Sequence, residues 1–347
     1  MSAALAYLLR RLGWALVLIA GITTLSFVVS QLLPGDPARM TLGPQASAAD
    51  VAQARAIYGL DQPIREQYRR YLTRLIHLGP SVIDPKKDLD HRSCGSVGVG
   101  LHLHLHLHLD LGFSFFYRKP VVDLLAAKIP RSFELAVAAL LLQLLFGVGL
   151  GTFAASRRHT AWDEAATGLT LLGVSAPTFL SGLLLQYVFA YKLGVLPYDG
   201  YGTSSADHLR SLVLPALTLG LFGSALYARL TRDELGALLD QDFIRAARGR
   251  GASGSRVLVV HALRNALLPL ATLAALDFGT LVGGAVVTER VFRWPGLGQM
   301  AVDAVLNRDG PVIFGTVLFA STAVIASTLV LDLLLVALDP RLRSKSH

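Results

Sequence analysis

Long apolar stretches divide this chain into segments of membrane-spanning length and polar connections between them. Each stretch is about as long as, or longer than, the roughly 20 residues that a helix needs to cross a bilayer. Six such stretches are present: 9–31, 132–155, 164–192, 210–230, 266–288 and 311–338. The pattern predicts an all-α membrane protein with six transmembrane helices and a large loop after the first helix.

The positions of the basic residues predict how the chain is oriented. An even number of spans places both termini on one side, and the basic residues of the termini and of the loops 156–163 and 231–265 fall on that side. The positive-inside rule identifies this side as cytoplasmic. The loop 32–131 is longer than the roughly 60 residues over which the rule applies, so it can be external despite its basic residues. We expect a multi-pass protein of the cell inner (cytoplasmic) membrane, with both termini cytoplasmic and with 193–209 and 289–310 also outside.

These boundaries predict four consecutive parts. An N-terminal anchor helix is followed by an external loop, a five-helix core and a short cytoplasmic tail. The loop contains a His-rich insertion, and the core contains a large cytoplasmic loop. The ranges are 1–31 for the anchor, 32–131 for the external loop with its insertion at 80–109, 132–338 for the core with its cytoplasmic loop at 240–269, and 339–347 for the tail.

The external loop has periodicities of its own. Residues 48–78 carry apolar residues at helical spacing and predict one or two amphipathic helices, interrupted near 59–63. Residues 80–100 lack periodicity and are rich in turn-forming residues, which predicts irregular structure. From 101 to 109 Leu and His alternate strictly, which predicts a strand with His on one face. The histidines of this face are His102, His104, His106 and His108.

Composition agrees with a membrane location. Hydrophobic residues make up 53% of the 347 residues and charged residues only 16%, against roughly 25% charged in ordinary soluble domains. The net charge of +8 would suit a nucleic-acid binder in a soluble protein, but here basic residues orient helices and meet anionic membrane lipid. We therefore expect contact with lipid and no nucleic-acid partner. A single cysteine, Cys94, excludes an intrachain disulfide and a Cys-based metal site.

Sequence motifs for enzymatic chemistry are lacking. No GxxxxGK[ST] motif occurs, so any ATP-driven function needs a partner chain. Residues 249–254 match GxGxxG, but they lie between two Arg-rich helical segments instead of after a strand, which argues against dinucleotide binding. Residues 173–177 lack the last glycine of the GxSxG nucleophile elbow. We expect that the chain is not an enzyme.

The segment 240–269 predicts a helix, a bend and a second helix on the cytoplasmic side. Asp242 can cap a short helix that runs to Arg248, and the glycines that follow permit a sharp bend. Five arginines give this segment a basic surface: Arg245, Arg248, Arg250, Arg256 and Arg264. On residue chemistry alone, this surface either marks membrane topology or binds a partner.

The same segment carries a family resemblance. DFIRAARGRG at 242–251, followed by HALRNALLP at 261–269, resembles the cytoplasmic "EAA" loop of bacterial ABC-importer permeases, in the form of the dipeptide, oligopeptide and nickel subfamily. Other stretches agree with it: LLPGDP at 32–37, YGLDQP at 58–63, SAPTF at 175–179, VFRWPGLG at 291–298 and LDPRLR at 338–343. The resemblance covers nearly the whole chain. It implies a transmembrane permease subunit that forms half of the pathway for di- or oligopeptides or a related small solute.

The resemblance also implies partners and residue roles. The partners are a homologous second permease, two ABC ATPase subunits, and an external or periplasmic solute-binding protein. No cofactor is implied on this chain, because ATP and Mg would bind to the partner ATPases. In the family, the core of the loop docks in a cleft of the ATPase, which implicates Ala246, Ala247 and Gly251 here, with Arg245 and Arg248 beside them. Arg245 replaces the Glu of the wider motif, so a salt bridge inferred from that Glu is not carried over.

The insertion at 80–109 departs from the family, which typically passes quickly into a Gly-Asp-Leu-Gly segment matched here by 109–112. Four alternating histidines could bind a transition metal. Same-face neighbours on a strand are about 7 Å apart, however, which is awkward for one tetrahedral ion. A low-complexity expansion is the favoured interpretation, and a metal site or a contact with the binding protein is the alternative.

Asp277 lies in the middle of the fifth predicted span. An ionisable residue there costs at least about 2.5 to 3.5 kcal/mol, so it usually faces a cavity or a partner. Two roles stay open: Asp277 lines the translocation path, or it bridges helices. Asp332 is expected to be structural and Glu134 to reach the interface. A self-sufficient channel or secondary transporter is the rival function, but no internal repeat supports it.

Overall fold

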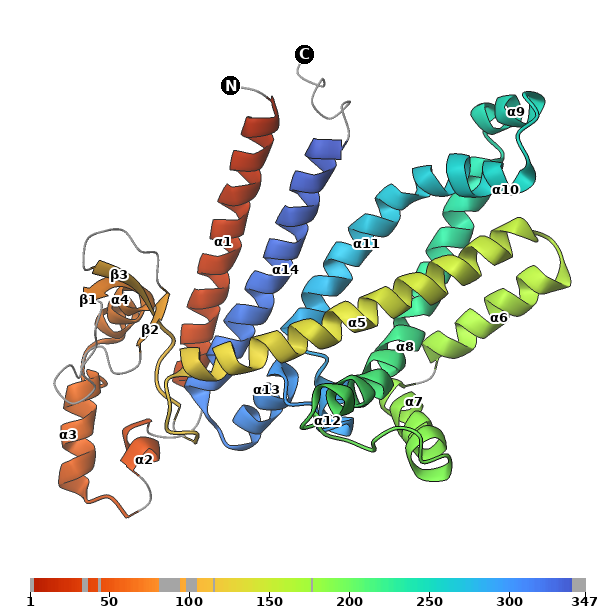
Figure 1. The fold of residues 1–347 in the computed structure, drawn as a ribbon. Coiled ribbons are helices and arrows are strands. Elements are labelled where there is room, and N and C mark those ends of the chain that lie inside the picture. Colours follow the sequence, from red (N-terminus) through yellow and green to blue (C-terminus); the bar gives the residue numbers. More distant parts are fainter. Residues whose placement is uncertain are drawn as a thin grey trace. The chain divides into compact units, whose positions relative to one another are not determined.

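A computed structural model describes residues 3–32, 37–42, 45–80, 94–97, 105–114, 116–175 and 177–338 of the chain. Within these residues, five helical segments are long and apolar enough to cross a membrane: Leu9–Val29, Val121–Ser156, Ser205–Leu239, Gly254–Val291 and Gly310–Leu333. The helix that makes up most of each segment is, in chain order, α1 (Ala3–Leu32), α5 (Val121–Ser156), α8 (Ser205–Leu239), α11 (Arg264–Gly283) and α14 (Gly310–Leu338) (Figure 1). They match five of the six predicted spans and confirm the helical membrane class.

The third predicted span, 164–192, is divided instead of continuous. Helix α6 (Ala161–Ser175) ends just before Pro177, and α7 (Thr178–Leu185) starts after it and continues into the π-helical segment η2 (Gln186–Lys192). Pro177 is extended, with ψ of 134°, and makes no side-chain cap. Proline lacks the N–H that a continuous helix needs and disfavours helix in the residue before it, which accounts for the break.

The chain separates into two compact units. Unit 1 comprises Met1–Arg11, Pro130–Gln299 and Thr322–His347, and unit 2 comprises Leu12–Ile129 and Met300–Ser321. The remaining helices of unit 1 are α9 (Asp242–Gly249), α10 (Gly254–Arg256), the π-helical η3 (Val257–Leu263) and α12 (Val286–Val291).

Unit 1 is held together by close helix packing and one large apolar cluster. A Cβ added at Gly147 or Gly151 of α5 would meet the backbone of α8, and one added at Gly279 of α11 would meet the backbone of α14. Helix pairs in membranes often use glycine at such contacts, because it lets the backbones approach. The cluster joins the ends of α5, α8, α9, η3 and α11: Ala155, Tyr227, Leu235, Ile244, Ala247, Val257, Ala262, Ala266 and Leu270.

Unit 2 contains α2 (Pro37–Leu42), α3 (Ala48–Tyr58), α4 (Ile64–Leu75) and α13 (Leu297–Leu306) from Met300 onward. Of the one or two amphipathic helices predicted for 48–78, α4 is amphipathic and α3 is not, and residues 76–78 form a strand instead of helix. Gly59 ends α3 within the predicted interruption, with a φ of 68°. The Phe27 ring of α1 lies 5.1 Å from the Tyr68 ring of α4, and the Tyr68 hydroxyl is 2.7 Å from Thr24 Oγ1.

A small antiparallel sheet also belongs to unit 2. Its strands are β1 (Ile76–Pro80), β2 (Cys94–Val97) and β3 (Leu105–Asp110), in the order β1-β3-β2. The strand predicted from the Leu/His alternation is confirmed over 105–109, while 101–104 lie outside the described residues. The prediction of irregular structure over 80–100 was wrong at Cys94–Val97, because pairing with β3 supplies backbone hydrogen bonds to four residues that show no periodicity of their own.

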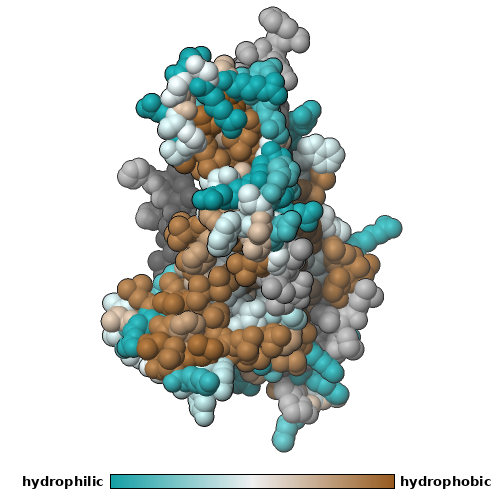
Figure 2. Space-filling model, turned by 90° about the vertical axis from the view of Figure 1, so that its right-hand side faces the viewer, coloured by the Kyte–Doolittle hydropathy of each residue, from teal (hydrophilic) through white to brown (hydrophobic). Residues whose placement is uncertain are grey.

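Exposed apolar residues are abundant on the described helices. Figure 2 looks onto the side where α6, α7 and α9 lie in Figure 1, and it shows hydrophobic residues over a broad lower area and hydrophilic residues gathered toward the upper end. Large exposed side chains include Leu169, Phe179, Leu184, Tyr187 and Tyr191 of α6, α7 and η2. Apolar surface of this extent is typical of helices that contact lipid or another membrane chain.

Candidate coupling site

The predicted helix, bend and second helix are present between α8 and α11. Helix α9 begins after Gln241, whose backbone is extended, and it ends at Gly249. The N–H of Gly251 donates to the Arg248 carbonyl at 2.9 Å, and that of Ala252 donates to the Ala247 carbonyl at 3.2 Å. Gly251 has a φ of 85°, a conformation that suits glycine because no Cβ is present. This glycine closes α9 and lets the chain turn into α10 and η3.

Helix α9 has an inward and an outward face. Ile244 and Ala247 are 0% and 3% exposed and belong to the cluster with Leu235 of α8. Arg245, Ala246 and Arg248 are exposed. The five predicted coupling residues therefore lie together on α9 and its bend, but Ala247 packs against its own chain.

Sequence reasoning missed an aromatic residue on the outward face. Phe243 is 39% exposed on α9 and stands three residues before Ala246. Residues three apart on a helix share a face. Arg250, seven residues after Phe243, is also exposed and follows the end of the helix. The spacing 243, 246, 250 could have indicated this face, whereas which face is buried depends on η3 and α8.

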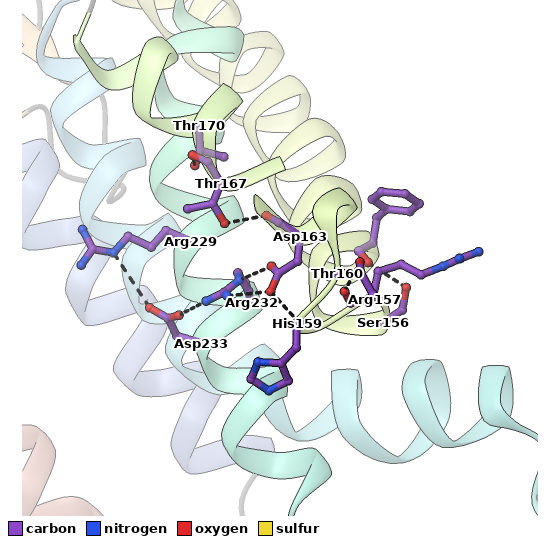
Figure 3. A network of polar contacts seen from close by, with 11 residues as sticks. Ser156, Arg157, His159, Thr160, Asp163, Thr167, Thr170, Arg229, Arg232 and Asp233 are labelled. Atoms are coloured by element: carbon purple, nitrogen blue, oxygen red, sulfur yellow. Dashed lines mark hydrogen bonds and ion pairs between the residues drawn. The ribbon is translucent and has the colours of Figure 1, made fainter. Parts of the chain in front are cut away.

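A polar network lies near the end of α8 that leads into α9 (Figure 3). Asp163 of α6 accepts hydrogen bonds from Arg232 Nε at 2.6 Å and Nη2 at 2.8 Å. Arg158, in the connection between α5 and α6, donates from Nη1 to the Gly236 carbonyl of α8 at 3.0 Å. A pocket of about 360 Å³ lies next to this network between α5, α6 and α8, and Thr167 and Arg232 contribute to its lining.

Asp277 joins two helices of the membrane region. The Tyr227 hydroxyl of α8 donates to Asp277 Oδ2 at 3.3 Å, and Tyr227 is 1% exposed. Asp277 itself is half-buried, and its backbone carbonyl accepts from Thr280 Oγ1 at 2.7 Å. The geometry gives Asp277 a contact between α8 and α11, one of the two predicted roles.

The other acidic residues of the spans also have partners. Asp332 lies 3.0 Å from Arg11 Nε, which agrees with a structural role. Glu134 contacts His208 Nε2 and accepts from the Tyr201 hydroxyl at 3.3 Å, so it is held by neighbouring residues of unit 1. Burial and the Glu134 carboxylate raise the pKa of the Tyr201 hydroxyl.

Glu289 is a buried acid that sequence reasoning did not single out. It is 0% exposed, and its carboxylate accepts from Ser132 Oγ at 2.9 Å and from the Gln299 N–H at 2.9 Å. Trp294 is equally buried and donates from Nε1 to the Arg131 carbonyl at 3.0 Å. These bonds fix the turn within the VFRWPGLG motif against the start of α5 in unit 1.

The histidine segment is only partly described. His106 and His108 lie in β3, and His102 and His104 lie outside the described residues. Within the described part of the chain, no group of three or more His, Cys, Asp or Glu side chains is placed to hold a metal ion.

Comparison with known proteins identifies the family. The binding-protein-dependent transport system inner membrane component family matches residues 147–344, and the N-terminal family of such components matches residues 4–86. The glutathione transport system permease protein GsiC of Salmonella paratyphi A is 36% identical over 339 residues, which cover 98% of this chain and 99% of GsiC. GsiC of Escherichia coli (strain K12) is 34% identical over the same shares of both chains.

A solved structure supports the fold. A chain of the inward-facing MetNI methionine ABC transporter aligns with a TM-score of 0.53 and 17% identity, covering 63% of this chain and 98% of that chain. The family match and the full-length relatives confirm the predicted permease class. The chain therefore belongs to the family of binding-protein-dependent transport system inner membrane components and is the permease subunit of an ABC importer.

Proposed function

We propose that this chain forms half of the translocation pathway for a peptide or a related small solute, driven by ATP hydrolysis on partner subunits. The full-length similarity to glutathione permeases supports a peptide-like solute, because glutathione is itself a small modified peptide. The partners in this proposal are a homologous second permease, two ATPases that bind ATP and Mg, and an external solute-binding protein.

The outward face of α9 carries the proposal. It combines exposed Arg245, Ala246 and Arg248 with the apolar ring of Phe243. The opposite face of this short helix packs into the buried cluster with α8 and η3. A helix of this kind suits a groove in a partner that offers acidic groups around an apolar floor. Ala247 and Gly251 serve this contact indirectly: Ala247 seats α9 on α8 and η3, and Gly251 sets the bend.

The orientation follows from the basic residues. We place both termini and α9 in the cytoplasm, and the loop 32–131 with its insertion 80–109 outside, where it can contact the solute-binding protein. Cys94 lies in this loop and provides the test. We expect a membrane-impermeant thiol reagent to label Cys94 in intact cells. Labelling only after the membrane is opened would reverse the orientation.

Asp277 is the candidate contact for solute within the path. One carboxylate oxygen accepts from the buried Tyr227 hydroxyl, and the residue remains half-buried. A carboxylate held in this way can receive the ammonium group of a peptide while staying attached to α8.

Purification of the chain from its native membrane tests the proposed function most directly. We expect two ATPase subunits and a second permease to accompany it. We also expect ATP-dependent uptake by proteoliposomes that contain this complex together with the solute-binding protein. A chain that transports solute alone, without ATP or partners, would establish the rival secondary transporter.

A further inference from the structure

The start of α6 is fixed to α8 by a bidentate ion pair (Figure 3). Both Asp163 oxygens accept from the Arg232 guanidinium, at 2.6 and 2.8 Å, and the backbone N–H of His159 donates to the same carboxylate at 3.3 Å. The Asp163 side chain is only 5% exposed. Two parallel charge-assisted hydrogen bonds fix orientation as well as distance, so α6 cannot rotate freely against α8 at this point.

Arg158 makes a second attachment in the same turn between α5 and α6. It donates to the Gly236 carbonyl at 3.0 Å and lies 3.2 Å from Asp240 Oδ2. A Cβ at Gly236 would lie 3.2 Å from the guanidinium carbon of Arg158, so glycine provides the room that the guanidinium occupies. Asp240 ends α8 and Gln241 precedes α9, and Arg158 therefore holds the elbow between these two helices.

The elbow is itself one packed body. Leu235 of α8, Ile244 and Ala247 of α9 and Ala155 of α5 lie in the same buried cluster. Buried contacts of this density transmit displacement instead of absorbing it. A movement of α9 therefore moves the end of α8 and, through the two attachments, the start of α6.

Beyond the ion pair, one side of α6 borders a pocket lined mainly by small and apolar residues. This pocket of about 360 Å³ lies between α5, α6 and α8, which also packs closely against α6, and several of the lining residues are small: Gly151, Ala154, Ala166 and Ala228. Helix α6 is thus fixed to α8 by Asp163 near its start, and at its other end it is separated from α7 by the break at Pro177.

We propose that Asp163, Arg232 and Arg158 are positioning residues that tie α6 to the α8–α9 elbow, so that displacement of α9 by the ATPases moves α6 and, with it, the third span. The inference rests on the proposed function, since it assumes that α9 receives the ATP-driven movement. In this proposal the three residues act through α6 and not through contact with solute or nucleotide.

The test separates coupling from folding. Replacing both partners of the ion pair by apolar residues of similar size, Asp163→Leu with Arg232→Met, leaves no charge buried without a partner, and such replacements are often tolerated. Uptake and ATP hydrolysis are measured separately in proteoliposomes that contain the complete complex. We expect an assembled complex that hydrolyses ATP, with the solute transported per ATP reduced about fivefold or more. A wild-type ratio would overturn the proposal, because the pair would then serve only the fold.

A second set of variants covers the case in which the double variant does not assemble. Gly236→Ala keeps every charge but crowds the Arg158 guanidinium, which must shift by a few tenths of an ångström, and Arg158→Met removes the guanidinium. Both are expected to lower the ratio of uptake to hydrolysis, with partial recovery in Arg158→Lys. Arg157→Gln is the matched control in the same turn and should retain the wild-type ratio.

Unchanged ratios in Gly236→Ala and Arg158→Met would refute the positioning role, whatever the double variant does. The wild-type complex separates this result from a failure of the proposed function. A wild-type chain that binds no ATPase contradicts the proposed function. A working wild-type complex, together with variants that have the wild-type ratio of uptake to ATP hydrolysis, contradicts only the positioning role.

Discussion

Two acidic residues packed against α8 are stabilised in different ways. Asp163 of α6 lies against the end of α8 that leads into α9, where it accepts two hydrogen bonds from the Arg232 guanidinium. Asp277, on α11, meets the phenol of Tyr227 at 3.3 Å, and no Lys or Arg of the described residues forms an ion pair with it. The first charge is neutralised within the chain, and the second is only hydrogen-bonded.

We propose that this difference separates a structural from a functional use of an acid. A carboxylate that is paired with Arg has little attraction left for a solute. Removing one partner of such a pair leaves the other charge buried and unpaired, which destabilises the fold. A carboxylate held by a neutral hydroxyl has no protein cation next to it that would compete with a cationic solute. We therefore expect substitutions near Asp163 to change stability and coupling, and substitutions near Asp277 to change solute handling.

The largest effect is expected from Arg232→Met alone. It leaves Asp163 buried without its cation, which costs about 3 kcal/mol, the lower end of the range for a broken buried pair because Arg232 is 35% exposed. Thermal unfolding of the detergent-solubilised protein measures this loss. Asp163→Leu with Arg232→Met should recover most of it, and a single variant as stable as wild type would remove the distinction between the two acids.

The elbow beside Asp163 offers a second comparison, between adjacent alanines. Ala247→Trp places a large ring into the buried cluster and should destabilise the protein by about 1 to 3 kcal/mol. Ala246→Trp places the same ring on the exposed face of α9, so the protein should reach the membrane normally but lose ATPase binding. Co-purification and membrane yield distinguish the two, and equal behaviour of the pair would contradict the assignment of faces.

The sequence alone could not distinguish these alanines. Both belong to the motif that indicated the coupling loop, and helical spacing separates their faces without telling which face the chain buries. That choice depends on Leu235 and Val257, which are not adjacent to α9 in the sequence. Likewise, Asp163 and Arg232 are 69 residues apart, and each looks like an ordinary charged residue next to a span.

Features with a local cause were predicted better. Apolar length predicted five of the spans, the glycines after 248 predicted the bend, and strict alternation predicted β3 over 105–109. The break at Pro177 also has a local cause, but hydropathy continues across it and hides it. Strand β2 has no such signal, because its four residues are ordered only by pairing with β3.

An intermediate effect is expected at the bend that follows α9. Gly251→Val forces a β-branched residue into a φ of 85°, which costs about 1 to 3 kcal/mol. A Cβ at Gly251 would meet no atom within 4 Å, so the cost arises from backbone conformation. Gly249→Val, at a helical position that is equally uncrowded, is the control and should have a much smaller effect. ATPase binding and thermal unfolding of both variants measure the difference, and equal losses would refute a requirement for the left-handed backbone.

The smallest effect on stability is expected at Asp277, where the effect on transport should be specific. Tyr227→Phe removes one hydrogen bond and should cost about 1 kcal/mol, while Asp277→Asn keeps the shape and a hydrogen-bonding group but removes the charge. If the charge receives a peptide ammonium group, Asp277→Asn lowers uptake of a peptide with a free amino terminus more than uptake of its N-acetylated form, in complexes that assemble normally. If Asp277 only bridges α8 and α11, Tyr227→Phe and Asp277→Asn lower both uptakes equally. The selective loss would also explain why this acid, unlike Asp163, has a neutral partner: a cation of the protein at the same place would compete with the solute for the carboxylate.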